Sequence, residues 1–458
     1  MPKQNQRNLS GKVAIKRTRK IDRISSLPDS LLCHILSFLP TIEAKATGVL
    51  SRRWRHLWKE VPVLYFEDDP FNLPGLSDDE VEEYFVDFVD NVVAQHKVPH
   101  VEKFKLECSV CGEDTLTRWI SSAVGPHLKE LDLCLCIYRD DYPETCDLPP
   151  SVFTCASLES LALKYRIYLY SLPDVCLPSL KNLELDTIYV NPEKVLSGCP
   201  VLENLKLILE AFPLNPGINY PAIHMPHSLK RLTFADKSRE DSLKLLEVDT
   251  PSLEYLDIKL QGHYLNVLFS HFTNMVKAQL DIYPQDKHLD WIPELLKALR
   301  STERLVLKLD TTTCLLRAPA LNYPEFCRLH NLVIDIPCSN SAFLINLIQH
   351  CPILRVLIIY NQKGGYFCSE KHSEPSSWTP PANDPICVTS NLMILGFSGY
   401  RDSADEHAFI AYILQKGLVL AIMKVLINVE LRPKKTYTIR KKLSTLPRGS
   451  KTVHLIIK

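Results

Sequence analysis

The stretch Leu180-Lys-Asn-Leu-Glu-Leu-Asp186 decides the fold of this chain, because its spacing of leucines returns in Leu202-Glu-Asn-Leu-Lys-Leu-Ile208. Both stretches follow the pattern apolar-x-x-apolar-x-apolar. In an extended strand successive side chains point to opposite faces, so the second and third apolar residues enter a core while their neighbours face outward. The pattern begins at Val101, Leu128, Leu158, Leu180, Leu202, Leu229, Leu253, Met275, Thr302, Leu329, Leu354 and Leu392.

Prolines mark the same units. One proline stands two residues before the first apolar residue in five of them, at Pro126, Pro178, Pro200, Pro251 and Pro352. Proline cannot continue a helix, and it favours an extended chain just ahead of it. We therefore expect each unit to contain one strand and one helix or turn, with helical segments most evident at residues 193–200 and 343–352.

The spacing of the units indicates the fold class. Successive starts lie 22 to 30 residues apart, except for one step of 38. Leucine-rich repeats recur every 20–29 residues or so, and such units must stack on their neighbours to bury their leucines. The sequence thus predicts an α/β solenoid, with an irregular leucine-rich-repeat horseshoe at residues 101–375 and a parallel β sheet on its concave face.

The outward-facing positions of these strands are candidates for binding a target protein. They are mixed and mostly polar or charged, which suits recognition of a protein surface, although a merely solvated sheet face would have the same composition. Val356, Ile358 and Tyr360 are apolar and allow two readings, contact with a target or cover by the C-terminal region. The candidate residues are Asn182, Glu184, Asp186, Asn204, Lys206, Arg231, Tyr255, Asp257, Lys259 and Tyr360.

Residues 21–66 predict three short helices ahead of the repeats. Leucine and isoleucine side chains between residues 31 and 39 follow the helical period, and Pro40 ends that helix. Thr41 can cap a second helix through its hydroxyl, and Ser51 can begin a third that carries Trp54 and Trp58. Three such helices are too few to form a core of their own, so they must lean on the rest of the chain, on a partner, or on both.

These helices also carry a family resemblance, in Leu27-Pro-Asp29, Leu36-Ser-Phe-Leu-Pro40 and Val49-Leu-Ser-Arg-Arg-Trp-Arg-His-Leu-Trp58. The three segments resemble the F-box of the plant F-box/leucine-rich-repeat/FBD proteins. The resemblance implies that the segment docks on a Skp-type adaptor and so joins a cullin–RING ubiquitin ligase. It also implies the adaptor contacts Leu27, Pro28, Ile35, Leu36, Pro40, Val49, Leu50 and Trp54, although several of these can equally pack the F-box itself.

One residue of the F-box departs from the family pattern. Gly48 stands where a serine or similar residue is expected inside the second helix, and glycine there costs about 1 kcal/mol relative to alanine. The alternative function is therefore a ligase-independent repeat scaffold whose F-box has degenerated. An adaptor pull-down distinguishes the two.

The C-terminal part resembles the FBD region of the same family. The resemblance rests on residues such as Trp378, Leu395, Tyr400 and Phe409, together with a capping box that begins at Ser403. We expect this α+β region to close the C-terminal end of the solenoid. The expected domains are a disordered basic tail at 1–20, the F-box at 21–66, a linker and capping helix at 67–100, the repeats at 101–375 and the FBD region at 376–458.

Composition narrows the functional classes. Lys+Arg and Asp+Glu both total 53, so the net charge is zero and predicts no nucleic-acid or membrane partner. A cluster of Lys16, Arg17, Arg19 and Lys20 is either part of a solvated tail or a nuclear-import signal. With no apolar run of membrane-spanning length and a polar N-terminus, we expect a cytoplasmic or nuclear protein.

The residues predict neither a cofactor nor catalysis. Only 14 of the 458 residues are glycine, and phosphate-binding glycine loops, the zinc-protease motif and the nucleophile elbow are missing from the sequence. The 15 cysteines are expected to be buried reduced thiols. Cys108-x-x-Cys111 and Cys134-x-Cys136 fit a metal site poorly, because the second pair has the wrong internal spacing.

Overall fold

The computed structural model describes residues 24, 26–97, 101–109, 111–135, 145–169, 171–209, 222–237, 244–261, 264–283, 291–317, 322–362 and 380–458. The expected basic tail with its possible import signal lies outside these residues. Cys136 and Trp378 lie outside them as well.

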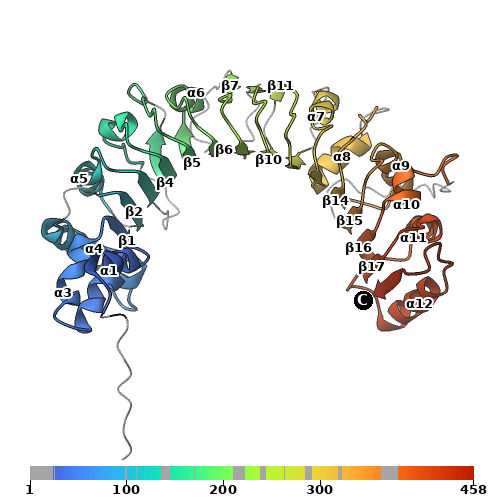
Figure 1. Cartoon of the computed structure of the whole chain (residues 1–458), viewed down its shortest axis with the longest axis horizontal. Coiled ribbons are helices and arrows are strands. Elements are labelled where there is room, and N and C mark those ends of the chain that lie inside the picture. Colours follow the sequence, from blue (N-terminus) through green and yellow to red (C-terminus); the bar gives the residue numbers. More distant parts are fainter. Residues whose placement is uncertain are drawn as a thin grey trace, which may run out of the picture.

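Fifteen parallel strands form one curved sheet, and they follow one another in the sheet in chain order (Figure 1). All described pairings between neighbours in this sheet are parallel, as a stack of strand–helix units requires. The strands of this sheet are β1 (Val63–Glu67), β2 (Lys103–Cys108), β3 (Glu130–Leu135), β4 (Ser160–Leu169), β5 (Asn182–Val190), β6 (Asn204–Leu209), β8 (Arg231–Asp236), β10 (Tyr255–Leu260), β12 (Lys277–Ile282), β13 (Arg304–Leu307), β14 (Asn331–Ile336), β15 (Val356–Asn361), β16 (Ile394–Tyr400), β17 (Ile422–Ile427) and β18 (His454–Ile457).

The repeat pattern located these strands accurately. A strand of the sheet begins two residues after every one of the pattern's starts, including the weak ones at Met275 and Thr302. The pattern also fits β1, through Val61, Leu64 and Phe66. The sequence-based domain bounds place these three residues in the F-box segment. The sheet therefore begins inside residues 21–66 and not at residue 101.

The core lies behind this sheet and consists of two rows of side chains. Parallel register sets Leu183 of β5 beside Leu161 of β4 and Leu205 of β6, and the third apolar position of each strand forms the second row in the same way. Both rows are buried along the whole sheet, up to the partly buried residues of the edge strand β18. Each unit thus buries its leucines against its neighbours, as expected for stacked repeats.

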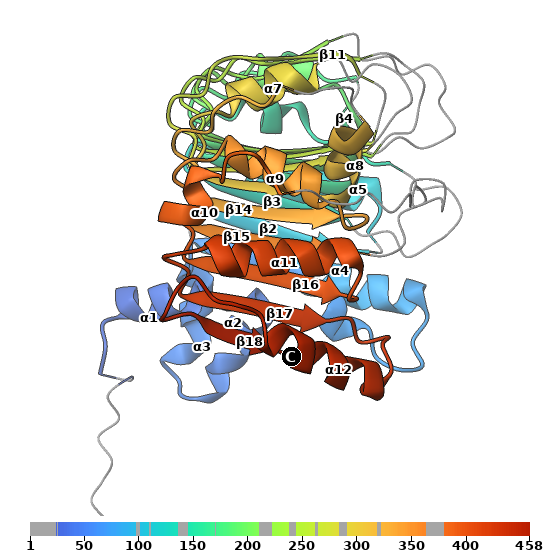
Figure 2. The same cartoon turned by 90° about the vertical axis from the view of Figure 1, so that its right-hand side faces the viewer.

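The segments between strands form the outer, convex side of the curve (Figures 1 and 2). Three of them are strands and not helices, and they make a small sheet of β7 (Ala222–His224), β9 (Lys244–Val248) and β11 (Tyr264–Phe269) that the sequence did not predict. The remaining segments include α5 (Glu113–Ala123), η4 (Pro150–Thr154), α6 (Pro192–Leu196), α7 (Ile292–Ala298), α8 (Leu309–Arg317), α9 (Ser341–Gln349), α10 (Ile386–Ser390) and α11 (Ala404–Lys416).

The N-terminal helices lie against the first strand. They are α1 (Asp29–Leu36), α2 (Thr41–Ala46) and α3 (Trp54–Leu57), with the 3₁₀ turns η1 (Thr47–Val49) and η2 (Trp58–Glu60). The expected roles of Thr41 and Ser51 are wrong. Pro40 occupies the N-cap of α2 without a side-chain hydrogen bond, and the Thr41 hydroxyl accepts a hydrogen bond of 2.9 Å from the Tyr65 backbone of β1. Helix α3 begins only at Trp54.

Two longer helices begin with the expected capping boxes. In α4 (Asp78–Gln95), which follows the short turn η3 (Asp69–Phe71), Ser77 and Glu80 satisfy each other's backbone N–H groups, and Ser403 and Glu406 do the same for α11. At the end of α11 the sequence predicts a left-handed conformation for Gly417, as glycine often adopts just after a helix. That prediction is wrong, because its φ is −77°. A β-carbon at Gly417 would lie 2.7 Å from the Ile413 carbonyl oxygen, so close packing and not backbone conformation favours glycine there.

Strand β16 depends on another glycine. Gly399 has φ +81°, and a β-carbon there would lie 2.2 Å from the carbonyl oxygen of Asn361 on β15. Gly75 also has positive φ, at +98°, but a β-carbon there would meet nothing within 4 Å. The two positions therefore separate the cost of conformation from the cost of a steric clash.

We predict that Gly399→Ala lowers the free energy of unfolding by about 2 kcal/mol more than Gly75→Ala. Both substitutions incur a left-handed backbone penalty of about 1–2 kcal/mol, and only the first also forces β15 and β16 apart. Chemical denaturation of the two variants measures the difference. Equal losses of stability would show that β16 relaxes freely around residue 399.

Candidate functional site

The N-terminal helices expose an unusual number of large apolar side chains. Those of Leu31, Ile35, Phe38, Val49 and Leu50 are all exposed, and Val49 and Leu50 are 88% and 66% accessible. Helix α1 places Leu31 and Ile35 one turn apart on its outer side, while Leu32 and Leu36 face the core. We call these five residues the outer helical surface.

The structure separates the expected adaptor contacts into two groups. Ile35, Val49, Leu50 and Pro28 are exposed, and Leu27 and Pro40 are partly buried. Leu36 and Trp54 are buried, at 1% and 5% accessibility, so the expectation that they contact an adaptor is corrected: their side chains pack the helices against one another. Leu31 and Phe38 are exposed beside Ile35 although the sequence did not single them out; their spacing at i and i+7 around Ile35 was the available signal.

Arg53 fixes the start of α1 to α3. Its Nε donates to an Asp29 carboxylate oxygen at 2.7 Å, and its guanidinium also donates to the Leu27 carbonyl oxygen at 2.6 Å. One side chain therefore holds the Leu27-Pro28-Asp29 segment in place. The Arg53–Asp29 ion pair is partly exposed, so it adds little to the free energy of unfolding, and its main effect is to position the segment.

Gly48 has a structural explanation that the sequence did not give. Helix α2 ends at Ala46, and Gly48 lies in the following 3₁₀ turn η1, outside the regular helix where it was expected. A β-carbon at Gly48 would lie 3.3 Å from the Arg55 α-carbon of α3. The residue allows η1 and α3 to approach closely, so the helix-propensity cost does not apply.

The second candidate surface is the concave face of the sheet. Neighbouring strands bring Asn182, Asn204, Arg231 and Tyr255 into one row, and Glu184, Lys206 and Asp257 into the next row together with Thr233. Asp186 and Lys259 belong to a third row, and Tyr360 lies at the same level on β15. All ten residues therefore lie on the face of the sheet opposite the buried leucine rows. The sheet lines the concave side of the curve, and the helices lie outside it (Figure 1).

Most of these polar side chains already bind one another along the rows. Lys206 lies 2.7 Å from Glu184, Lys164 lies 3.4 Å from Glu184 and 3.7 Å from Asp132, and Asn204 donates to Asn182 at 2.7 Å. Further along, Gln279 donates to Asp257 at 3.2 Å, Lys259 pairs with Asp281 at 3.4 Å, and Arg231 and Lys277 flank the Tyr255 ring. We call this arrangement, from β3 to β12, the charge ladder.

Partial burial shifts the pKa values of the ladder. Burial raises the pKa of the Asp257 carboxyl, against the opposing charge of Lys277. At Glu184 burial acts in the same direction, but the hydrogen bond from Lys206 and the charge of Lys164 outweigh it and lower the pKa. At Glu184 the neighbours thus outweigh burial and stabilise the ionised carboxylate. At Asp257 burial outweighs the neighbours and destabilises it.

The described residues offer no site for metal-dependent catalysis. No three His, Cys, Asp or Glu side chains gather among them in a way that could hold a metal ion. Cys108 and Cys111 are buried beside each other, where their hydrogen bond and burial raise the pKa of the Cys108 thiol. Within the same residues, no helix has the length and apolar character needed to span a membrane.

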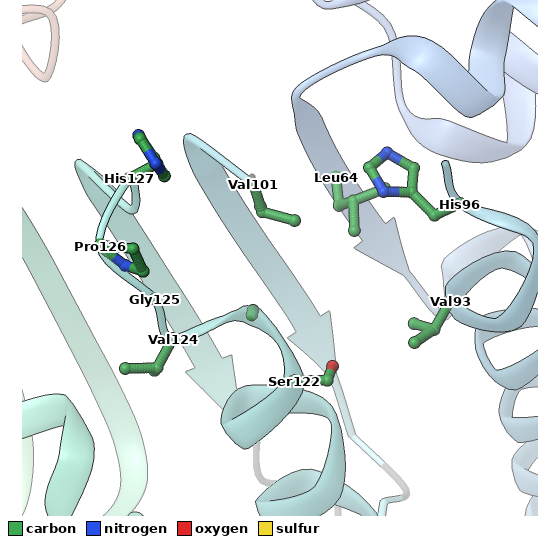
Figure 3. A pocket seen from close by; sticks show the side chains of 10 residues that line it. Leu64, Val93, His96, Val101, Ser122, Val124, Gly125, Pro126 and His127 are labelled. Carbon is green, nitrogen blue, oxygen red and sulfur yellow. The ribbon is translucent and has the colours of Figure 1, made fainter. Parts of the chain in front are cut away.

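A cavity of about 460 Å³ lies between α4 and the ends of β2 and β3 (Figure 3). Its lining is mixed, with Leu64, Val93 and Val101 beside His96, Ser122 and His127. The His96 ring nitrogen is already engaged at 2.8 Å by the Val61 carbonyl oxygen. This contact fixes the end of α4 to the chain just before β1.

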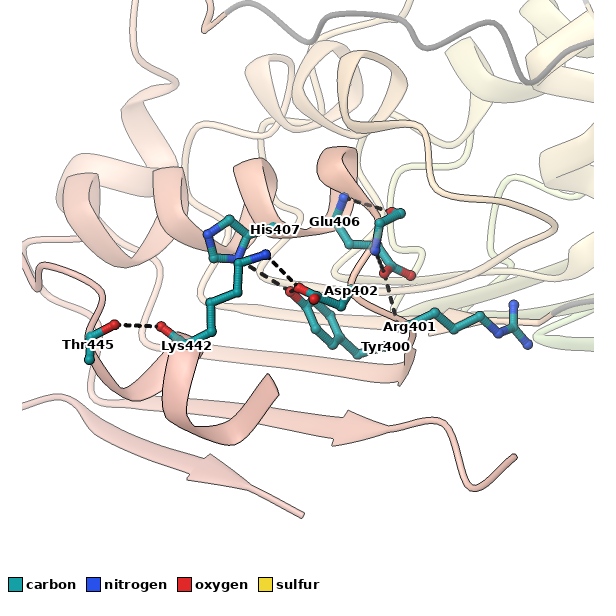
Figure 4. Close-up of polar contacts among 8 residues, drawn as sticks. Tyr400, Arg401, Asp402, Glu406, His407, Lys442 and Thr445 are labelled. Carbon is teal, nitrogen blue, oxygen red and sulfur yellow. Dashed lines mark hydrogen bonds and ion pairs between the residues drawn. The ribbon is translucent and has the colours of Figure 1, made fainter. Parts of the chain in front are cut away.

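A polar cluster joins the last helix, α12 (Pro433–Ser444), to the sheet (Figure 4). Lys442 lies 2.9 Å from Asp402, whose carboxylate also accepts from the Tyr400 hydroxyl at 3.3 Å. The His407 ring stands 3.5 Å from the same hydroxyl, and burial with the nearby Lys442 charge lowers the pKa of His407. Because Tyr400 is fully buried and Lys442 reaches it from the surface through Asp402, this cluster anchors α12 to the sheet.

Comparison with known proteins identifies the two regions of the chain that carry these surfaces. The F-box domain family matches residues 24–66, and the family of leucine-rich repeats described for the FBD-associated F-box protein At5g56370 matches residues 116–268. At5g56370 itself, from Arabidopsis thaliana, is 30% identical over 455 residues, covering 95% of this chain and all of that protein. The chain belongs to the plant F-box/leucine-rich-repeat/FBD family.

The names of two other relatives from Arabidopsis thaliana combine an F-box with leucine-rich repeats. The F-box/LRR-repeat protein At3g59200 is 30% identical, with 93% of this chain and 86% of that protein covered. The F-box/LRR-repeat protein At4g14096 is 37% identical over a shorter region, 57% of this chain and 54% of that protein. The N-terminal helices are therefore an F-box, and the curved sheet contains its leucine-rich repeats.

The raised pKa of Asp257 gives a prediction for stability. Ionisation of Asp257 in the folded chain lowers the free energy of unfolding. This loss is absent below the pKa of the unfolded chain, about 3.9, and reaches its full size once the pH exceeds the pKa of the folded chain. Asp257→Asn should therefore raise the free energy of unfolding at pH 7, by less than about 1 kcal/mol because the site is partly solvated. Urea unfolding at pH 7 and pH 3 should show the gain shrinking at the lower pH.

Asp281→Asn is the control on the neighbouring strand. It removes the partner of Lys259 and should lower stability at pH 7 by up to about 0.5 kcal/mol. A stabilisation of both variants would mean that general repulsion among carboxylates, and not burial of Asp257, governs the ladder.

Proposed function

We propose that this protein is the non-catalytic substrate-recognition subunit of a Skp–cullin–F-box ubiquitin ligase. In this proposal the F-box docks a Skp-type adaptor, and through it a cullin–RING ligase, while the leucine-rich repeats bind a target protein. The observation that carries it is the outer helical surface, because the F-box exposes five large apolar side chains that its own core does not bury. Family membership supplies the class of partner.

The proposed mechanism is proximity. A receptor that holds a target and a charged ubiquitin carrier in one complex makes their encounter intramolecular, which raises the effective concentration of each for the other. This needs a rigid connection between the two binding surfaces. The hydrogen bond from Tyr65 to Thr41 joins α2 directly to the first strand of the sheet and supports such a connection.

The adaptor contacts that we propose are Ile35, Val49 and Leu50, extended by Leu31 and Phe38 and bordered by Leu27, Pro28 and Pro40. The target contacts belong to the concave face. The C-terminal FBD region is proposed to close the solenoid, because β16, β17 and β18 continue the parallel sheet and α11 and α12 pack over its end. For the tail at residues 1–20, nuclear import and simple solvation remain the two proposals.

The alternative, a repeat scaffold with a degenerate F-box, had Gly48 as its support. That support weakens, since Gly48 serves the contact between η1 and α3. Purified wild-type protein that folds but does not bind a Skp-type adaptor would establish the alternative.

We predict that the double variant Val49→Asp/Leu50→Asp weakens adaptor binding at least 10-fold, since carboxylates would have to be desolvated in an apolar interface. Its unfolding temperature should be unchanged, because both side chains are exposed in the free chain. Titration of a purified Skp-type adaptor by calorimetry measures the affinity. Unaltered affinity in a folded variant would remove Val49 and Leu50 from the proposed interface.

The matched control is Leu418→Asp/Val429→Asp. Leu418 and Val429 are 61% and 98% accessible and lie at the other end of the chain, so the pair introduces the same charges on equally exposed apolar residues. It should leave adaptor affinity within about twofold. A loss comparable to that of the F-box variant would indicate a non-specific effect of charge.

A further inference from the structure

The concave face changes its chemistry between β12 and β13. The charge ladder occupies the strands up to β12, where polar side chains bind one another across neighbouring strands. From β13 onward the same outward positions are largely apolar. We call the following residues the apolar concave patch: Val306, Val333, Val356, Ile358, Tyr360, Ile394, Ile422 and Ile456.

Strand register makes this patch continuous. Val333, Ile358 and the outward position Gly396 lie opposite one another on β14, β15 and β16, and Val356, Ile394 and Ile422 do so on β15, β16 and β17. Gly396 leaves no gap, because a β-carbon there would lie 2.9 Å from the Ile358 δ-carbon. The Ile358 side chain thus reaches over β16 and joins the two parts of the patch.

The C-terminal region extends this patch and does not cover it among the described residues. Tyr360, Ile422 and Ile456 are exposed, and the helices α9, α10 and α11 pack together on the other side of the sheet (Figure 2). The interpretation that the C-terminal region covers Val356, Ile358 and Tyr360 is therefore not supported. Its strands instead contribute three further isoleucines.

The charges around the patch that have no ion pair among the described residues are all positive. Lys424, between Gly396 and Ile456, is exposed, as are Arg304 and Arg355 at the start of β13 and β15, and none of the three has an ion pair among the described residues. The acidic residue at this level, Asp335, is already engaged by Lys308 at 3.6 Å and Gln362 at 3.4 Å. Carboxylates on a partner would therefore meet unpaired cations.

We propose that the apolar concave patch binds a segment of the target protein that presents aliphatic or aromatic side chains together with carboxylates. This rests on the proposed receptor function and narrows it to one class of target and one part of the concave face. Six strands at about 4.8 Å spacing span about 24 Å, enough for about seven residues of extended chain. The charge ladder is less suited to this role, because covering its paired charges costs desolvation that the partner must replace.

The test is selection of a random 12-residue peptide library on the full-length protein, followed by affinity measurement with the selected peptides. We expect peptides enriched in Leu, Ile, Phe, Asp and Glu. Ile358→Asp and Ile422→Asp should each weaken their binding at least 10-fold, and Lys164→Ala in the ladder should change it less than twofold. Ile422 is the more exposed of the two and serves if the Ile358 variant does not fold.

Charge reversal provides the sharper readout. Lys424→Glu should shift the selected peptides from acidic to basic, and Lys435→Glu, an exposed lysine on α12, should leave the selection unchanged. Adaptor binding measured on the same preparations separates this proposal from the receptor proposal, because the F-box and the patch are far apart along the sheet.

Three results would overturn the proposal: selected peptides without apolar and acidic enrichment, binding lost in Lys164→Ala but not in Ile358→Asp or Ile422→Asp, or a dimer that those two variants dissociate. The last would identify the patch as an interface between two copies of this chain. A photo-crosslinker at position 358 provides a direct check. Crosslinking to the selected peptide in preference to this chain supports the proposal. Crosslinking to this chain alone contradicts it.

Discussion

The contact between equivalent leucines on adjacent strands is the constraint on which the whole structure depends. Each strand contributes two inward side chains, and parallel register places them against the same two positions of the strands before and after it. Burying one such side chain is worth about 1.5–3 kcal/mol. Because every leucine needs a neighbour on both sides, the stack is stable only as a continuous series and is weakest at its two ends.

Different contacts hold the two ends of the stack of strands. At the N-terminal end the F-box contributes the first strand, and Phe66 of that strand packs against Phe88 of α4 and Phe104 of β2. At the C-terminal end, buried Glu406 accepts from Asn361 at 2.7 Å and from the Arg401 backbone at 3.0 Å, so one carboxylate fixes α11 to the sheet. The F-box is thus part of the solenoid, which explains why three short helices can be ordered without a core of their own.

Periodicity located the strands because every unit shares the same constraint. Features that depend on one particular contact or one particular unit could not be predicted. The small sheet of β7, β9 and β11 replaces helices on the convex side, where several structures can cover the same leucines. Thr41 bonds to Tyr65 and not to its own helix, which depends on a tertiary contact that no local motif encodes. At the candidate sites, the motif could not tell exposed Val49 from buried Trp54, because both are apolar and only their burial in the folded chain distinguishes them.

The concave face shows why outward polarity alone is a poor guide to binding. In the charge ladder each cation has a carboxylate or an aromatic ring on the next strand, so the surface satisfies itself and gains little from a partner. Where strands β13 to β18 carry valine and isoleucine instead, no such lateral satisfaction is possible, and the exposed area remains a source of free energy for association. In the proposed receptor, specificity can then arise where paired charges give way to apolar side chains, which in this chain is from β13 onward.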